Sequence, residues 1–362
     1  YLEQCSKEDL DDAFRVKECT YRKVFETEFN LSFGHPKSDT CSTCDANSAD
    51  EEHVINYHAA FDALRSDREK AKNLENIAFL TIDLQQTMPL PRLSTSKAFY
   101  MRQMWLYNFG LHIVTKEVDK ALFCTWTEDQ ASRGSSEILS CLLTALEVEE
   151  SLRNKDHLVI WSDSCSGQNK NFLLICLYQY LVHKRQFKTI DHKFPEVGHT
   201  YLDSDRDFGR IEKNLRKHQN IYSPEEYREI IVKSSRKNKV IDMTHHFRDT
   251  NTLMTNMKLY NRKKDMGNSQ VHFRDHIKWL RVDEYGYYQF KTCYDEFTPF
   301  RKVNIFHSLK SVPKLEEEVS IRRLQRKTGS IKEAKLENLR EQLQFIPEHH
   351  RWWYIQILNE LQ

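Results

Sequence analysis

The sequence predicts an α/β protein built on one mixed sheet with helices on its flanks. Two short apolar runs, one ending at Asp83 and one at Asp163, read as strands buried on both faces. Strand-like and helix-like segments alternate between them and after them. With 39% apolar and 30% charged residues, the 362-residue chain has the composition of a globular protein, and its few Gly and Pro argue against long flexible linkers.

The order of these segments narrows the fold class. Aromatic and β-branched residues favour strands, and apolar residues at helical spacing favour helices. The expected strands span 76–86, 104–116, 120–128, 157–164 and 187–194, and the expected helices span 135–152, 168–184 and 203–217. Three antiparallel strands followed by two strand–helix units are the layout of the RNase H-like fold, which we therefore expect.

The rest of the chain surrounds this core. We expect a helical region with a Cys/His zinc site in 1–75, the RNase H-like core in 76–217, a basic and aromatic extension of it in 218–310, and a helical region in 311–362.

Charge is unevenly distributed along a chain whose formal net charge is +1. Residues 1–75 hold 10 Lys and Arg against 17 Asp and Glu, a net −7, and residues 206–282 hold 18 against 9, a net +9. A polyanion is therefore expected to meet the later segment. No apolar run reaches the ~18 residues of a membrane span. Nine cysteines, several of them in apolar runs, argue against a secreted disulfide framework and indicate a reducing compartment.

Carboxylates mark the predicted catalytic site. Asp83 and Asp163 end the first and fourth strands, which are neighbours in this fold. Two carboxylates side by side repel, and a divalent cation such as Mg²⁺ or Mn²⁺ removes that conflict. Two such ions can activate an attacking oxygen and stabilise a leaving one. The polar loop SDSCSGQNKN, with Gln168 and Asn169, suits metal or phosphate contact, and His199 lies in a second loop near the expected site.

The third acid stays open between Asp205 and Glu212 in the helix 203–217. The two lie seven residues apart on one helical face, whereas Asp207 is expected to face solvent or cap the helix. A helix that begins at the active edge would use Asp205. A helix that crosses the site at its middle would use Glu212, which we favour slightly.

A CxxC pair, Cys41 and Cys44, suggests structural zinc. We expect His58 as a third ligand and His35 as the fourth, with His53 or Cys19 as alternatives to His35. For DNA, the expected backbone contacts are basic residues on and after the last core helix: Arg210, Lys213, Arg216, Lys217 and Lys237.

Several strings occur together in order: FNLSFGHPKSDTCSTC, FLTIDLQQTMPLP, LYNFGLH, the RGSSEILSC run after Trp126, SDSCSGQNKN and GHTYLDSDRDFGRIEK. Together they resemble a family of transposon-derived proteins of animal genomes that look like DDE/D-type transposases with an RNase H-like core. The resemblance covers roughly residues 20–310. One departure is Ser164, where the family pattern has Asn.

The resemblance implies carboxylates at Asp83, Asp163, Asp205 and Glu212, and zinc ligands at the cysteine pair and His58. It also implies a nuclear enzyme that cuts transposon ends and joins them to target DNA. Three readings stay open: an active transposase, a nuclease of the same fold, and a host-adopted DNA- or protein-binding module without catalysis. Homo-oligomerisation is left open as well.

Overall fold

The computed structural model describes residues 16–29, 41, 44, 51–199, 201–250, 252–306, 321–324 and 331–360. The chain divides into two compact units, residues 1–47 and 48–362. The described part of the smaller unit contains one helix, α2 (Glu18–Thr27), none of whose residues is buried. The helix α4 (Glu51–Asn73), which the sequence placed with the N-terminal region, belongs to the larger unit. There its Ala60 and Ala71 join a buried cluster with the sheet.

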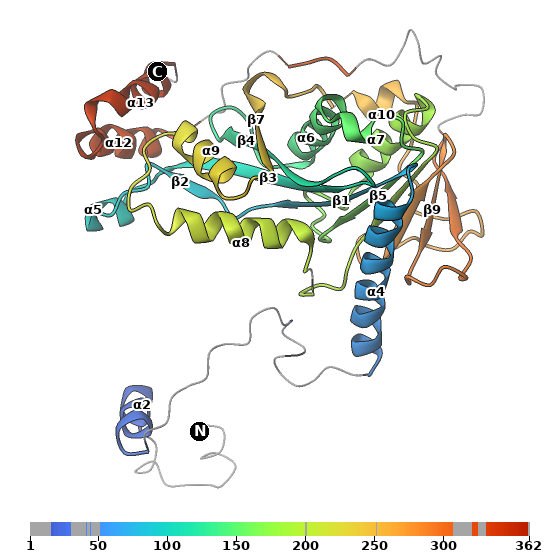
Figure 1. Cartoon of the computed structure of the whole chain (residues 1–362), viewed down its shortest axis with the longest axis horizontal. Coiled ribbons are helices and arrows are strands. Elements are labelled where there is room, and N and C mark those ends of the chain that lie inside the picture. The colour runs from blue at the N-terminus through green and yellow to red at the C-terminus, as the bar shows by residue number, and fades with distance from the viewer. Residues whose placement is uncertain are drawn as a thin grey trace. The chain divides into compact units, whose positions relative to one another are not determined.

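A mixed sheet is the centre of the larger unit (Figure 1). Its strands among the described residues are β1 (Ile77–Leu84), β2 (Met88–Leu90), β3 (Met104–Val114), β4 (Asp119–Thr127), β5 (His157–Ser162), β6 (Thr189–Lys193), β7 (Asn238–Asp242), β8 (Trp279–Val282), β9 (Tyr287–Lys291) and β10 (Arg301–Asn304). They are ordered β10-β9-β8-β6-β5-β1-β3-β4-β7, and β2 pairs with β3 off this path.

The central five strands follow the predicted pattern. β1 pairs antiparallel with β3 and parallel with β5, β3 pairs antiparallel with β4, and β5 pairs parallel with β6. This order, β4-β3-β1-β5-β6, is the layout expected of an RNase H-like core and confirms the predicted class of a mixed sheet with flanking helices.

The extension 218–310 widens this sheet at both edges. β7 pairs parallel with β4, and β8 pairs antiparallel with β6 and continues into β9 and β10. The sequence indicates an aromatic-rich strand pair near Tyr285–Lys291, a range that contains β9. The others are four or five residues long and mix charged with apolar positions, which leaves little periodicity to read.

Helices cover both faces of the sheet. Besides α4 they are α5 (Ser96–Phe99), α6 (Ser135–Val148), α7 (Phe172–His183), α8 (Asp203–Leu215), α9 (Pro224–Lys233), α10 (Leu253–Asn256), α12 (Glu333–Gln342) and α13 (Arg351–Glu360). In Figure 1, α8 runs along one face of the sheet, while α6 and α7 lie on the other. Among the described residues, no helix has the length and apolar character to cross a membrane.

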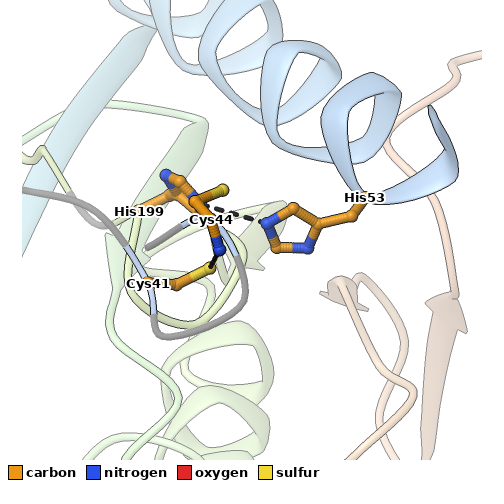
Figure 2. Close-up of side chains that lie close together, drawn as sticks. All are labelled: Cys41, Cys44, His53 and His199. Carbon is orange, nitrogen blue, oxygen red and sulfur yellow. Dashed lines mark hydrogen bonds between the residues drawn. The ribbon is translucent and has the colours of Figure 1, made fainter. Parts of the chain in front are cut away.

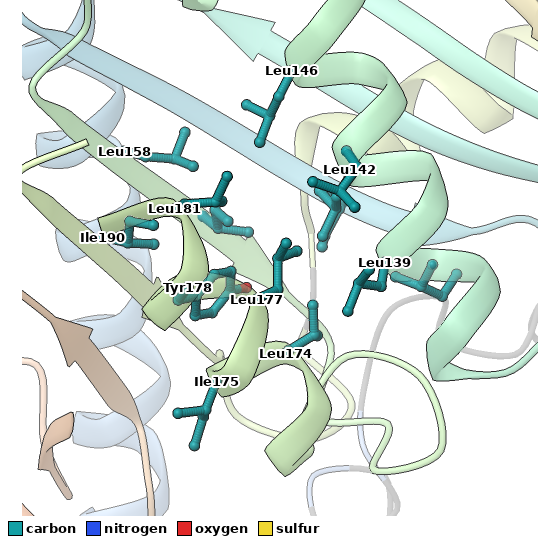
Figure 3. Close-up of a cluster of buried hydrophobic side chains, with 14 of the residues drawn as sticks. Leu139, Leu142, Leu146, Leu158, Leu174, Ile175, Leu177, Tyr178, Leu181 and Ile190 are labelled. Carbon is teal, nitrogen blue, oxygen red and sulfur yellow. The ribbon is translucent and has the colours of Figure 1, made fainter. Parts of the chain in front are cut away.

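Alternation along β1 explains the two layers, because successive side chains of a strand point to opposite faces. Leu80 and Ile82 join the cluster that includes Leu142 of α6 and Leu177 of α7 (Figure 3). Phe79, on the other face, joins the cluster with α4. Further along that face, α8, α9 and the C-terminal helices α12 and α13 share a third cluster with β2 and the starts of β3 and β4. Asp83 has the parity of Phe79, so it belongs to the face that α4 and α8 cover.

Candidate metal centre

Asp83 and Asp163 lie at the same edge of the sheet, on adjacent parallel strands. Asp83 is the second-last residue of β1, and Asp163 directly follows β5. Ile82 is paired with Ser162 in the parallel register, so the two aspartates come next on both strands. Alternation then turns both carboxylates toward the face that α8 covers. The structure therefore brings together the two acids that the sequence singled out.

The first turn of α8 brings a third carboxylate to this edge. The backbone N–H of Ser204 donates to the Thr81 hydroxyl at 3.0 Å, which places the start of the helix against β1 two residues before Asp83. Asp205, the next residue, shares a side-chain hydrogen bond with Asp83. Asp205 also accepts from the backbone N–H of Leu202 at 2.8 Å, at the start of the helix.

The electrostatics of Asp83 reflect this crowding. Burial, followed by the negative charges of Asp163 and Asp205, raises the pKa of Asp83 to about 8. At neutral pH the protein without metal therefore keeps a proton on Asp83, which lets it donate to another carboxylate. A bound cation would reverse this preference, because it stabilises the ionised form.

Neighbouring donors hold Asp163 and Asp83 in place. Asp163 accepts from the side-chain amide of Asn169 at 2.7 Å and from the backbone N–H of Cys165 at 3.2 Å. Asp83 accepts from the backbone N–H of Leu84 at 2.8 Å. Asn169, in the polar loop, thus contacts the carboxylate of Asp163 directly. Gln168 instead donates to the backbone carbonyl of Arg133 at 3.5 Å.

Glu212, the acid favoured slightly from the sequence, lies outside this group. It accepts from the side-chain amide of Gln85 at 2.9 Å, and Gln85 in turn accepts from Asn108 at 2.8 Å. The reason is the direction of α8, which begins at this sheet edge and carries Glu212 about 10 Å further along its axis. The geometry therefore selects Asp205 as the third acid near Asp83.

Two other acids of α8 contact basic side chains. Asp207, expected at the surface, is buried and contacts His112 Nδ1 at 2.6 Å, because the face that α8 turns to the sheet includes residue 207. Asp203 accepts from the Arg68 guanidinium of α4 at 2.9 Å. These contacts hold α8 against β3 through Asp207 and against α4 through Asp203. Asp205 is only partly buried.

The donor set fits a hard divalent cation, since carboxylate oxygens are the preferred ligands of Mg²⁺ and Mn²⁺. The pKa of Asp83 is raised first by burial and then by the charges of Asp163 and Asp205, and a bound cation would favour the ionised form of all three carboxylates. Within the described part of the chain, the ligand atoms of these three residues do not all lie within 4.8 Å of one another.

Thiolate and imidazole ligands occur as two pairs, both drawn in Figure 2. In the smaller unit, the backbone N–H of Cys44 donates to Cys41 Sγ at 3.4 Å. In the larger unit, His53 Nε2 of α4 and His199 Nε2 lie 3.2 Å apart. Cysteine thiols and histidine imidazoles are the side chains that bind zinc in proteins, so each pair offers possible ligands.

These possible ligands differ from the predicted set. His58 lies five residues after His53, which turns it about 140° around α4, and its ring packs on Tyr57 instead. His35 lies outside the described residues. His199 was expected near the carboxylates but pairs with His53, a contact across 146 residues for which no local spacing gives a signal.

The predicted DNA-contacting residues lie on or close to the α8 side of the sheet. Lys213, Arg216 and Lys217 are exposed on α8 or just after it. Arg210 pairs with Asp207 at 3.0 Å, and Lys237 pairs with Asp119 at 3.0 Å.

Comparisons with known proteins give one family match. Residues 108–281 match the family described as "Domain of unknown function (DUF7869)". That range contains Asp163 and Asp205 and begins after Asp83. Among curated proteins, none matches this chain.

Solved structures with some similarity are three crystal structures of NurA. One, with dAMP and manganese bound, is 15% identical and covers 53% of this chain and 42% of its own, with a TM-score of 0.16. A second is 13% identical, with coverages of 66% and 49% and a TM-score of 0.16. A third, with manganese, is 14% identical, with coverages of 86% and 64% and a TM-score of 0.15. This chain spans less than two thirds of each, and TM-scores this low have no bearing on its function.

Proposed function

We propose that this chain is a metal-dependent enzyme that cuts DNA phosphodiester bonds and, as a DDE/D-type transposase, joins the freed ends to target DNA. One observation carries the proposal: Asp83, Asp163 and Asp205 meet at one sheet edge, where burial, followed by the negative charges of the other two, raises the pKa of Asp83 to about 8. Such an arrangement costs stability in a binding module, whereas it is what a divalent-cation site requires.

Each acid has a distinct role in this proposal. Asp83 and Asp163 would hold the cations from the strand ends, with Asn169 fixing the orientation of Asp163. Asp205 would complete the site from the helix. Two bound Mg²⁺ ions would supply stabilisation of the attacking and leaving oxygens in an in-line displacement. Exposed cations of α8, such as Lys213 and Arg216, would hold the DNA backbone beside the site. Such an enzyme would work in the nucleus.

The test is strand nicking of supercoiled DNA with Mg²⁺ or Mn²⁺, comparing Asp205→Ala with Glu212→Ala. Loss of a carboxylate at the metal should reduce the rate by at least about a hundredfold, as removal of one strong electrostatic contributor to phosphoryl transfer does. Glu212→Ala should keep most activity. An equal and mild loss in both variants would contradict the site assignment.

Transposition itself is tested separately, by strand transfer of an oligonucleotide carrying a free 3′-OH into a plasmid. Nicking without strand transfer would indicate a nuclease of the same fold. Neither activity, with DNA binding intact, would indicate a host-adopted binding module.

We also propose that the chain binds structural Zn²⁺, with Cys41 and Cys44 of the smaller unit and His53 and His199 of the larger unit as candidate ligands. Cysteine thiolates and histidine imidazoles are the side chains that structural zinc sites use.

A further inference from the structure

A cavity of about 500 Å³ lies beside the loop that follows Asp163. It is lined by that loop, the start of α7, two segments that precede β8, and Tyr288 of β9. Basic side chains dominate its lining, and aromatic rings occur among them: Lys170, Arg262, Lys263, His272 and Arg274, with Phe172, Phe273 and Tyr288. One acid, Asp275, also lines it.

Lys170 is the unusual member of this lining. The residue is only 2% exposed, and its ammonium group has no hydrogen bond or ion pair with any described residue. Its nitrogen lies 4.8 Å from the centroid of the Phe194 ring. Burying an ammonium group is costly. Burial, followed by the charge of Lys278, accordingly lowers the pKa of Lys170 to about 8, while the negative charges of Asp275 and Glu196 act in the opposite direction. An anion in the cavity would supply the missing partner.

The cavity is joined to the proposed catalytic centre through the backbone of one loop. Asn169, which donates to Asp163 at 2.7 Å, is followed directly by Lys170. The backbone N–H groups of both residues donate to the Cys165 carbonyl, at 2.8 and 3.0 Å, so the loop is a tight turn. In this turn the side chain of Asn169 contacts Asp163, and the side chain of Lys170 lines the cavity. A molecule bound in the cavity would therefore lie beside the loop that positions the carboxylate.

The mixture of cations and rings points to one class of ligand. Phosphate alone needs cations, whereas a base needs an exposed ring on which to stack. Phe273 is only partly buried and stands edge-on to Tyr288, with ring centroids 6.2 Å apart. A second cavity, of about 590 Å³, shares Asn261, Arg262 and Lys263 with the first, so the same basic segment separates two successive hollows. Double-stranded DNA keeps its bases stacked inside the helix and could not use the ring.

We propose that this cavity binds a single strand of nucleic acid, with its phosphates against Lys170, Arg262 and Arg274 and an unpaired base against Phe273. The inference rests on the proposed function, since it names the path by which one substrate strand leaves the carboxylates. The strand would run from Asp163 past Asn169 into the cavity.

The experiment measures binding without catalysis. Fluorescein-labelled oligo(dT) of twelve nucleotides is titrated with the full chain in EDTA, and anisotropy is followed at low salt. Lys170→Met removes the buried charge but keeps the length of the side chain, and it should weaken binding at least fivefold. Phe273→Leu should weaken oligo(dT) binding by a similar factor. Lys188→Ala, which removes an exposed lysine paired with Asp156 elsewhere on the surface, is the matched control and should leave binding unchanged.

The outcomes separate the possible ligands. Inorganic polyphosphate is added as a competitor that displaces oligo(dT) through phosphate contacts alone. If Phe273→Leu binds oligo(dT) as tightly as the parent and polyphosphate displaces it equally well, the cavity does not stack a base and the proposal is overturned. Tighter binding of a twelve-base-pair duplex than of oligo(dT), lost in Lys170→Met, would overturn it as well. Melting temperatures of both variants within a few degrees of the parent show that a loss is local. Because the assay contains no metal, intact cavity binding alongside failed nicking would reject the catalytic assignment alone.

Discussion

Replacing Asp83 by Asn should stabilise the metal-free protein, although it removes a residue of the proposed active site. Asp83 binds its proton more tightly in the folded chain than in the unfolded chain, because burial and two carboxylates raise its pKa from 3.8 to about 8. A group with a raised folded pKa contributes stability that is fully present below the unfolded value and lost as the pH rises through the folded one. Asn keeps the shape of the side chain and cannot ionise.

The size of the effect follows from the two pKa values of Asp83. At pH 7 the unfolded chain has released the proton of Asp83 and the folded chain still holds it. This difference builds up between the unfolded pKa of 3.8 and pH 7, a range of roughly three pH units. At about 1.4 kcal/mol for each unit, this difference lowers the free energy of unfolding by up to about 4 kcal/mol. We therefore expect Asp83→Asn to gain about 2–4 kcal/mol at pH 7, about 1 kcal/mol at pH 5 and almost nothing below pH 4.

Urea unfolding at pH 4, 5, 7 and 8 without metal measures this gain. The matched control is Glu212→Gln, which also replaces a carboxylate by an amide but lies on α8, outside the carboxylate group. Its free energy of unfolding relative to the parent should not rise between pH 4 and pH 8. Addition of Mn²⁺ should stabilise the parent and not Asp83→Asn, since a ligand that binds the folded state raises its stability. A variant less stable than the parent at pH 7 would refute the proposed crowding of carboxylates.

Two further predictions concern packing and zinc. A Cβ at Gly110 would lie 2.8 Å from the Phe208 ring. Gly110→Ala should therefore lower the free energy of unfolding by about 1–3 kcal/mol and reduce nicking by displacing α8. A Cβ at Gly209 would meet nothing within 4 Å, so Gly209→Ala should be neutral or stabilising in urea unfolding. Zinc content by elemental analysis should fall in His53→Ala and stay at one equivalent in His58→Ala; the reverse result would restore the ligand set expected from the sequence.

The core strands and helices were predictable because each carries its own signal. β1 and β5 are continuous apolar runs that end on an aspartate, and α6 and α7 have apolar residues at helical spacing. Asp83 and Asp163 could be placed together because register in a parallel pair fixes which strand ends meet. β7, β8 and β10 could not be predicted in this way, since these short strands gain their stability from pairing with the edges of the core.

The third acid could not be decided from the sequence because helical spacing treats Asp205 and Glu212 alike. The decision depends on where α8 begins relative to β1, and long-range contacts determine that. Ser204 donates to Thr81, and the Phe208 ring fits over Gly110, the β3 residue paired with Asp83.

Those two contacts lie one helical turn apart on α8 and leave the helix no freedom to slide along the sheet. A shift of one turn toward the active edge would place the ring of Phe208 near Thr81 and move Asp205 off the strand ends. The absence of a side chain at residue 110 therefore has a consequence for chemistry as well as for packing. It admits Phe208, Phe208 fixes the start of α8, and the start of α8 determines which acid faces Asp83.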